Sequence, residues 1–188
     1  MEKLSFDPAH TWLTADTHFG HGNIIRYCKR PFATVEEHDK AIMENLFRCC
    51  TEKDVLIHLG DVCFGSDRDV RRILAWLAKL PCRKLFIPGN HDRRNLREIA
   101  GVFSPLPDLC EIAVEGRGLR AVLCHYPLEE WDGAFRGALH FHGHVHGRRP
   151  SNRRREDVGV DAQCFTPVLL AELVSRLEKR KPMEGQDG

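Results

Sequence analysis

The sequence contains no long apolar run. No stretch of its 188 residues is apolar enough to span a bilayer, and the opening MEKLSFDPAHTW has neither the apolar segment nor the cleavage site of a signal peptide. We therefore expect a cytoplasmic protein that does not enter a membrane. The length predicts a single domain over residues 1–180, followed by a flexible tail over residues 181–188.

Paired cysteines are also lacking. The 8 cysteines are scattered and form no C-x-x-C pair, which argues against a zinc ribbon or a redox motif. The sequence further lacks a G-x-S-x-G elbow, an H-E-x-x-H pair and a glycine-rich Walker loop. Serine hydrolases, zincins and P-loop enzymes therefore have no support from the residues.

There is no excess of charge of either sign, because 28 Lys and Arg residues oppose 27 Asp and Glu residues. This balance argues against a dedicated duplex binder, and no aromatic residues are interleaved with basic ones to stack bases. The densest charge run, RRPSNRRRED at residues 148–157, predicts an exposed loop, and its arginines slightly favour a nucleotide or nucleic-acid substrate. Nucleic acid is thus a possible partner but not the favoured one, and no pattern indicates an oligomeric state.

What the sequence does contain, in its first half, is an alternation of strands and helices. Apolar periodicity predicts strands over residues 10–16, 54–61 and 84–92, with helices over residues 34–50 and 67–80 between them. Thr34 followed three residues later by Glu37 is typical of a helix N-terminus. Strands that alternate with helices predict parallel βαβ units.

The second half has fewer helices. The pattern predicts a hairpin over residues 111–125, strands over residues 138–144 and 157–162, and a last helix over residues 168–180. The hairpin is expected to turn between Gly116 and Gly118. We therefore predict an α/β fold in which two mixed β-sheets pack face to face with helices outside, a four-layer αββα sandwich.

Side chains that ligate metals follow the ends of five predicted strands. They occur in the segments TADTH, HLGD, IPGNHD, VLCHY and GHVH. Each segment alone has an ordinary reading, such as a turn or a buried histidine, and His140 and His142 are expected to be strand residues. Because the ligands of α/β sheets gather beyond the carboxyl ends of strands, the segments taken together predict a metal site.

In this order the segments DTH, GD, GNHD, H and GHVH resemble the five motifs of the calcineurin-like metallophosphoesterases. GNHD and GHVH are the most specific of them, and the match covers residues 16–146. The segment TADTHFGHGNIIRYCKRPF further resembles a branch of small, single-domain bacterial and phage phosphoesterases. The resemblance implies a pair of mixed sheets flanked by helices, in agreement with the fold predicted above.

The resemblance also implies roles for individual residues. It assigns one metal to Asp16, His18 and His146, the other metal to Asn90, His125 and His144, and a bridging position to Asp61. Such mixed nitrogen and oxygen ligands suit two divalent ions, with Mn²⁺ expected and Fe, Ni²⁺ or Zn²⁺ also compatible. A bridging hydroxide would attack phosphorus, and His91 would act as general acid. Asn90, His91, His21 and Arg148 are the candidate substrate-binding residues.

These roles predict a metallophosphoesterase that hydrolyses a small phosphodiester or nucleotide. A protein phosphatase is less favoured, because Phe64 in GDVCFG stands where that branch carries an aspartate that supports the catalytic histidine. Asp92 is a partial replacement if its side chain points toward His91. Two alternatives remain: a catalytically silent scaffold of the same fold, and a protein with a structural metal site. The scaffold predicts lost ligands, whereas this chain retains every ligand type.

Overall fold

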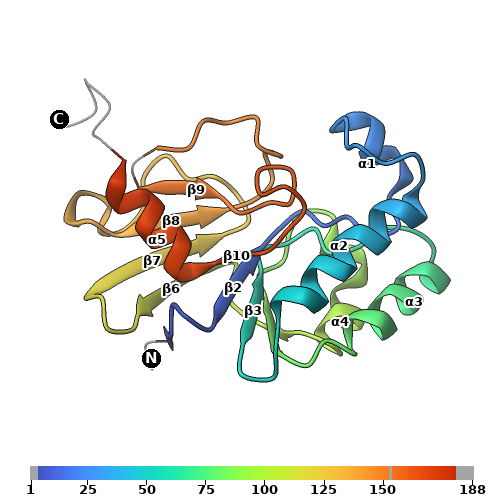
Figure 1. Ribbon diagram of the computed structural model, residues 1–188, viewed down its shortest axis with the longest axis horizontal. Coiled ribbons are helices and arrows are strands. Elements are labelled where there is room, and N and C mark those ends of the chain that lie inside the picture. The colour runs from blue at the N-terminus through green and yellow to red at the C-terminus, as the bar shows by residue number, and fades with distance from the viewer. Residues whose placement is uncertain (1–3, 153, 181–188) are drawn as a thin grey trace.

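The structure, a computed structural model, describes residues 4–152 and 154–180 (Figure 1). The predicted tail over residues 181–188 lies outside the described residues. Two five-stranded sheets, named sheet A and sheet B here, form the body of the molecule. Sheet A consists, in spatial order, of β1 (Leu4–Phe6), β6 (Leu109–Val114), β7 (Leu119–Cys124), β8 (Leu139–His142) and β9 (Arg155–Asp157). Sheet B consists of β10 (Val168–Leu169), β2 (Thr11–Thr14), β3 (Val55–His58), β4 (Arg83–Phe86) and β5 (Ser104–Pro105).

Both sheets are mixed, as the sequence predicted. In sheet B, β2, β3, β4 and β5 are parallel and β10 is antiparallel to β2. In sheet A, β6 and β7 form the predicted antiparallel hairpin, while the other neighbouring pairs are parallel. The carboxyl ends of β2, β3 and β4 therefore meet at one edge of sheet B, and those of β7 and β8 meet at one edge of sheet A.

The helical and 3₁₀ segments complete the fold. They are α1 (Gly22–Tyr27), α2 (Val35–Cys49), α3 (Asp67–Leu77), η1 (Asp92–Asn95), α4 (Leu96–Ala100), η2 (Ala134–Arg136) and α5 (Leu170–Lys179). The predicted start of α2 is confirmed, because the Thr34 hydroxyl accepts the Glu37 backbone N–H at 3.2 Å and the Glu37 carboxylate accepts the Ala33 N–H at 2.9 Å. The first bond satisfies an N–H group that the helix start leaves free, and the second holds the residue before the N-cap.

Two apolar clusters hold the layers together. One lies between the sheets and contains inward residues of both, among them Ile57 and Phe141, together with the apolar face of α5. The other joins the outer face of sheet B to α2, α3 and α4, with Met43, Ile73 and Phe86 among its buried members. Figure 1 shows these three helices on one side of β2 and β3. The predicted pair of mixed sheets flanked by helices is confirmed.

Some local predictions were wrong. The strand expected over residues 157–162 is instead β9, Arg155–Asp157, which begins inside the arginine-rich run that the sequence predicted to be an exposed loop. All three residues of β9 are buried, and the Arg155 guanidinium donates to the Leu128 carbonyl at 2.8 Å. A charged side chain can lie inside when its donors find carbonyl partners, which a charge count does not reveal. Within the described residues, no helix combines the length and apolarity needed to cross a membrane.

Candidate metal centre

Five of the predicted ligands lie in left-handed backbone. The φ angles are 55° for Asp16, 48° for His18, 59° for Asp61, 70° for His144 and 51° for His146. This region is costly for residues other than glycine and persists only where surrounding contacts enforce it, typically at functional sites. The turn after each strand thus aims these side chains inward rather than along the strand direction.

The first group of ligands, named the Asp16 group, comprises Asp16, His18 and His146. The potential ligand atoms of these three residues all lie within 4.8 Å of one another. The rings of His18 and His146 stack with centroids 5.3 Å apart. An isolated bridge between Ala15 and Gly159 joins the end of β2 to the segment after β9, and this brings the two halves of the chain together.

The second group, named the Asp61 group, comprises Asp61, His125 and His144, whose potential ligand atoms also lie within 4.8 Å of one another. One Asp61 carboxylate oxygen, Oδ2, lies 3.5 Å from Nε2 of His18 and 3.5 Å from Nε2 of His125. Asp61 therefore reaches both groups at once. Asn90 adjoins the second group, since its Oδ1 lies 3.1 Å from Nε2 of His125.

The donor set fits cations. His125 donates its Nδ1–H to the Leu59 carbonyl at 2.7 Å, which leaves its Nε2 facing the Asn90 oxygen at 3.1 Å. Asp16 Oδ1 and both ring nitrogens of His18 are buried without a hydrogen-bond partner. Polar atoms that lie buried without partners are costly, and a bound cation would remove this cost.

The pKa shifts of two of these ligands also fit a bound cation. Burial, with the carboxylates of Asp157 and Asp61 nearby, raises the pKa of Asp16 well above its usual range. Burial, with the neighbouring His146, holds the pKa of His18 well below its usual range, so this imidazole is neutral and able to ligate a metal. A divalent ion would compensate the buried carboxylate and would bind the free nitrogen.

Backbone amides hold the second oxygen of each carboxylate. Asp16 Oδ2 accepts the His144 N–H at 2.8 Å, and Asp61 Oδ1 accepts the His91 N–H at 2.9 Å. Each aspartate thus accepts a backbone N–H of a neighbouring ligand loop with one oxygen, and its other oxygen faces the cluster. The contacts between loops fix how the two carboxylates are oriented.

Asp92 has a structural role rather than the one considered from the sequence. Its carboxylate accepts backbone N–H groups from Asp61 at 2.7 Å, Val62 at 2.9 Å and Gly89 at 2.8 Å. Burial raises its pKa, although these three hydrogen bonds act in the opposite direction. Asp92 therefore ties the loop after β3 to the loop after β4, and both of its oxygens are already used.

Arg30 and Asp161 were missed by the sequence reasoning. The buried guanidinium of Arg30 donates to the backbone carbonyl of Asp16 at 2.8 Å and to that of Thr17 at 3.2 Å, and it forms a two-pronged ion pair with Asp161 at 2.9 and 2.7 Å. Asp161 in turn accepts the Nδ1–H of His146 at 2.7 Å. Burial lowers the pKa of His146, but the hydrogen bonds with Asp161 and Cys28 outweigh it and raise that pKa to about 10. A carboxylate in this place makes an imidazole a more basic ligand.

The predicted general acid, His91, lies at the exposed rim of the centre. Its ring centroid is 5.3 Å from that of His18, 6.3 Å from that of His21 and 5.9 Å from that of Phe64. Within the described residues, no carboxylate forms a hydrogen bond with the His91 ring. Phe64 meets this ring at an interplanar angle of 82°, so an aromatic side chain borders it where the protein-phosphatase branch has an aspartate.

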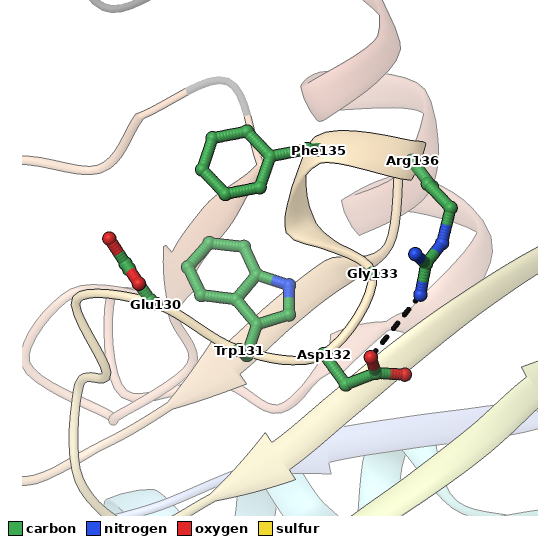
Figure 2. A pocket seen from close by; sticks show the side chains of 6 residues that line it. All are labelled: Glu130, Trp131, Asp132, Gly133, Phe135 and Arg136. Atoms are coloured by element: carbon green, nitrogen blue, oxygen red, sulfur yellow. Dashed lines mark hydrogen bonds and ion pairs between the residues drawn. The ribbon is translucent and has the colours of Figure 1, made fainter. Parts of the chain in front are cut away.

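The remaining candidate substrate residues are His21 and Arg148. His21 packs on Phe64 with ring centroids 4.4 Å apart, and burial lowers its pKa. Arg148 is exposed beyond the GHVH loop and donates from Nε to the Val145 carbonyl at 3.1 Å. A separate surface pocket, lined by residues 130–133, 135 and 136, contains none of the predicted ligands (Figure 2).

Two ligand groups at the carboxyl ends of strands, in a pair of mixed sheets, define an α/β fold with a candidate metal centre. The family model described as calcineurin-like phosphoesterase matches residues 9–165 of this sequence. The chain therefore belongs to the calcineurin-like phosphoesterase family, as the five motifs predicted.

The chain is also similar to curated relatives and to a solved structure. The chain is 30% identical over 177 residues to an uncharacterized protein of Methanocaldococcus jannaschii, covering 90% of this chain and 92% of that protein. It is 28% identical over 182 residues to the gene 66 protein of Mycobacterium phage L5, covering 82% and 87% of the two chains. A crystal structure of a protein of unknown function from Aquifex aeolicus matches with a TM-score of 0.73 at 25% identity, over 88% of this chain and 98% of that one.

A more distant likeness concerns the fold alone. The crystal structure of Pseudomonas putida nuclease MPE matches with a TM-score of 0.50 at 21% identity, over 73% of this chain and 61% of that one.

Proposed function

We propose that this protein is a phosphodiesterase that holds two divalent cations side by side and hydrolyses small phosphodiesters or nucleotides. The observation that carries the proposal is the position of Asp61 Oδ2, 3.5 Å from a ring nitrogen of His18 and 3.5 Å from one of His125. A carboxylate between two imidazoles of different ligand groups is suited to bridge two cations. In this assignment Asp16, His18 and His146 hold one ion, while Asn90, His125 and His144 hold the other.

The protein groups position and protonate the substrate. Two bound divalent ions, with Mn²⁺ expected, would supply an activated water and neutralise charge on the phosphate. The ligands Asp16, Asp61 and His125 are buried inside the site. Asn90 and His91, in contrast, are exposed to solvent. In this proposal the phosphate approaches from the side of His91, whose exposed ring would give a proton to the departing oxygen. His21 and Arg148 are the further candidates for contact with the phosphate.

Phosphodiesters are favoured over phosphoproteins by the surroundings of His91. The aspartate that would support this ring in a protein phosphatase is replaced by Phe64, and the carboxylate of Asp92 is already used by three backbone amides. Within the described residues no carboxylate is hydrogen-bonded to this ring, so the ring depends on neighbours such as Phe64 for its orientation.

The test combines calorimetric titration of Mn²⁺ with turnover of bis-p-nitrophenyl phosphate. The wild type is expected to bind two ions per chain and to release p-nitrophenol. His91→Ala should still bind two ions but lose turnover of thymidylyl-thymidine, whose alkoxide leaving group needs a proton, by about 10²–10⁴-fold, the contribution of general acid catalysis, and it should lose less turnover of bis-p-nitrophenyl phosphate. Asp61→Asn should weaken ion binding itself, because an amide is a poor bridge between cations.

Three results would contradict the proposal. Binding of a single ion per chain, with collapse of the fold on chelation, would indicate a structural metal site. A folded protein that turns over no ester with any first-row metal would indicate the silent scaffold. If His91→Ala emptied the site, the assignment of the ligands would be wrong.

A further inference from the structure

Two exposed aromatic rings border the candidate metal centre and have no part in the proposed chemistry. Phe64 is 43% exposed and Tyr126 is 40% exposed. The exposed part of each ring adds nothing to folding, since the hydrophobic effect stabilises only through buried area, and it is free to contact a ligand. Both rings, however, contact histidines of the site.

The two rings lie at different ends of the centre. Phe64 packs against His21 and His91, and the His91 ring centroid is 5.3 Å from that of His18 in the Asp16 group. Tyr126 packs against the two histidines of the Asp61 group, with centroids 5.0 Å from His125 and 4.8 Å from His144. A phosphate held over Asp61 would therefore have one ring on each side.

We propose that Phe64 and Tyr126 form two stacking subsites, and that the substrate is a phosphodiester with a nucleobase on each side of the scissile phosphate. A short unpaired oligonucleotide has this chemistry. Aromatic side chains stack on any base because every base has a π-face, so the sites would bind with little sequence preference. The inference rests on the proposed function, because it places the phosphate on the metal centre.

The position of His91 sets the direction of the substrate. The departing oxygen must lie beside His91, and the ring of Phe64 borders His91 with centroids 5.9 Å apart. The leaving nucleoside would therefore stack on Phe64, and the retained nucleoside on Tyr126. On the Phe64 side, Tyr27 and Arg26 extend the surface, with the Arg26 guanidinium carbon 5.4 Å from the Tyr27 ring centroid and the Tyr27 ring 6.4 Å from that of His21.

Two matched esters test the Tyr126 subsite. The p-nitrophenyl ester of thymidine 5′-phosphate and methyl p-nitrophenyl phosphate share a leaving group and differ only in the retained group. The Mn²⁺-loaded wild type should prefer the thymidine ester in kcat/KM by about fivefold or more, the low end of what one base–aromatic stack provides. Tyr126→Leu should lose most of this preference, mainly through KM, whereas Tyr126→Phe should keep it.

The same two esters are also compared in a variant of the second ring and in a matched control variant. Phe64→Leu should retain the preference between the two esters, because their leaving group is the same. Phe135→Leu removes a ring that is 77% exposed in the separate pocket of Figure 2, and it should behave as the wild type. Loss of the preference in Phe135→Leu would show that any exposed ring contributes, and would overturn the proposal.

Equilibrium binding tests both rings without turnover. In the Mn²⁺-loaded His91→Ala protein, thymidylyl-thymidine should bind at least about 25-fold more tightly than dimethyl phosphate, because two stacks of about fivefold each multiply, and Tyr126→Leu and Phe64→Leu should each remove about fivefold or more. Equal binding of the two compounds, or no effect of either substitution, overturns the stacking subsites even if both esters are hydrolysed. If neither ester is hydrolysed by the wild type, the proposed function fails instead, and the binding comparison still decides between the rings and a bare phosphate site.

Discussion

Arg30 lies buried between the two segments of the chain that supply the Asp16 group. Its guanidinium binds backbone carbonyls in the DTH motif, and it also binds Asp161, which orients His146. One side chain thus sets the position of ligands that are 128 to 130 residues apart in the sequence, counting from His18 or Asp16 to His146. Only a planar group with several donors can make these contacts together.

We therefore predict that Arg30→Lys weakens the metal centre. Lysine keeps the charge but cannot reach two carbonyls and two carboxylate oxygens at once, so His146 loses its orientation. The affinity for Mn²⁺ should fall about 10–100-fold, the usual effect of removing a group that orients a ligand. Calorimetric titration measures this, and Arg176→Lys, at an exposed pair with Glu172, is the matched control. Unchanged affinity in Arg30→Lys would show that Asp161 alone suffices.

At the scale of elements, the ends of β3 and β4 approach one another so closely that glycine is needed between them. A Cβ built at Gly89 would lie 2.2 Å from Asp61 Oδ1 and 2.6 Å from the Asp61 backbone nitrogen. The glycine of the GNHD motif therefore makes room for the bridging aspartate. Asp92, three residues later, accepts N–H groups from both loops and holds them at this separation.

We predict that Gly89→Ala reduces metal binding by displacing Asp61. The added methyl group would force apart the loops after β3 and β4, so the affinity for Mn²⁺ should fall by at least about tenfold, the lower end of what loss of a ligand's supporting contacts costs. Gly118→Ala is the control, because its Cβ meets nothing within 4 Å although its φ of +64° is unfavourable for alanine. That control should lower the free energy of unfolding by about 1–2 kcal/mol without changing metal affinity. Equal metal affinity in both variants would contradict the role of Gly89.

At the scale of the whole molecule, buried neutral histidines link stability to pH. His140 in β8 donates from Nδ1 to the Val122 carbonyl at 2.9 Å and accepts the Leu128 N–H at 3.0 Å, so it ties sheet A to the segment that follows Tyr126. Burial lowers its pKa to about 4, and burial lowers the pKa of His58, which pairs with Thr17, to about 3. Both values lie below the usual 6.5 of an unfolded histidine.

The sign of the effect follows from these values. Because the folded pKa of His140 is depressed, the stability that its neutral ring contributes is complete above pH 6.5 and is lost as the pH falls toward 4. Between pH 7 and pH 5, we predict that the wild type loses up to about 2 kcal/mol more of its unfolding free energy than His140→Gln does. Urea denaturation with the metals removed by chelation measures this difference. Parallel pH dependence in the two proteins would refute it.

Much of the fold followed from patterns along the chain. The alternation of strands and helices, the start of α2 at Thr34 and the hairpin of β6 and β7 depend on local periodicity and capping, and the structure confirms them. β9 did not follow, because its charged residues are buried only through partners such as the Leu128 carbonyl. Short strands such as β1 also carry too little local signal to be recognised.

The sequence by itself determined which side chains are available as ligands and the order in which strands present them. Carboxylates and imidazoles placed directly after apolar strands were expected to meet, because parallel strands end at the same edge of a sheet and the ligands of α/β sheets gather there. Only the tertiary structure decided that Arg30 and Asp161 orient His146, that Asp92 joins two loops, and that aromatic rings border both ends of the centre. Those roles depend on partners far along the chain, and a side chain's partners are set by packing rather than by its neighbours in sequence.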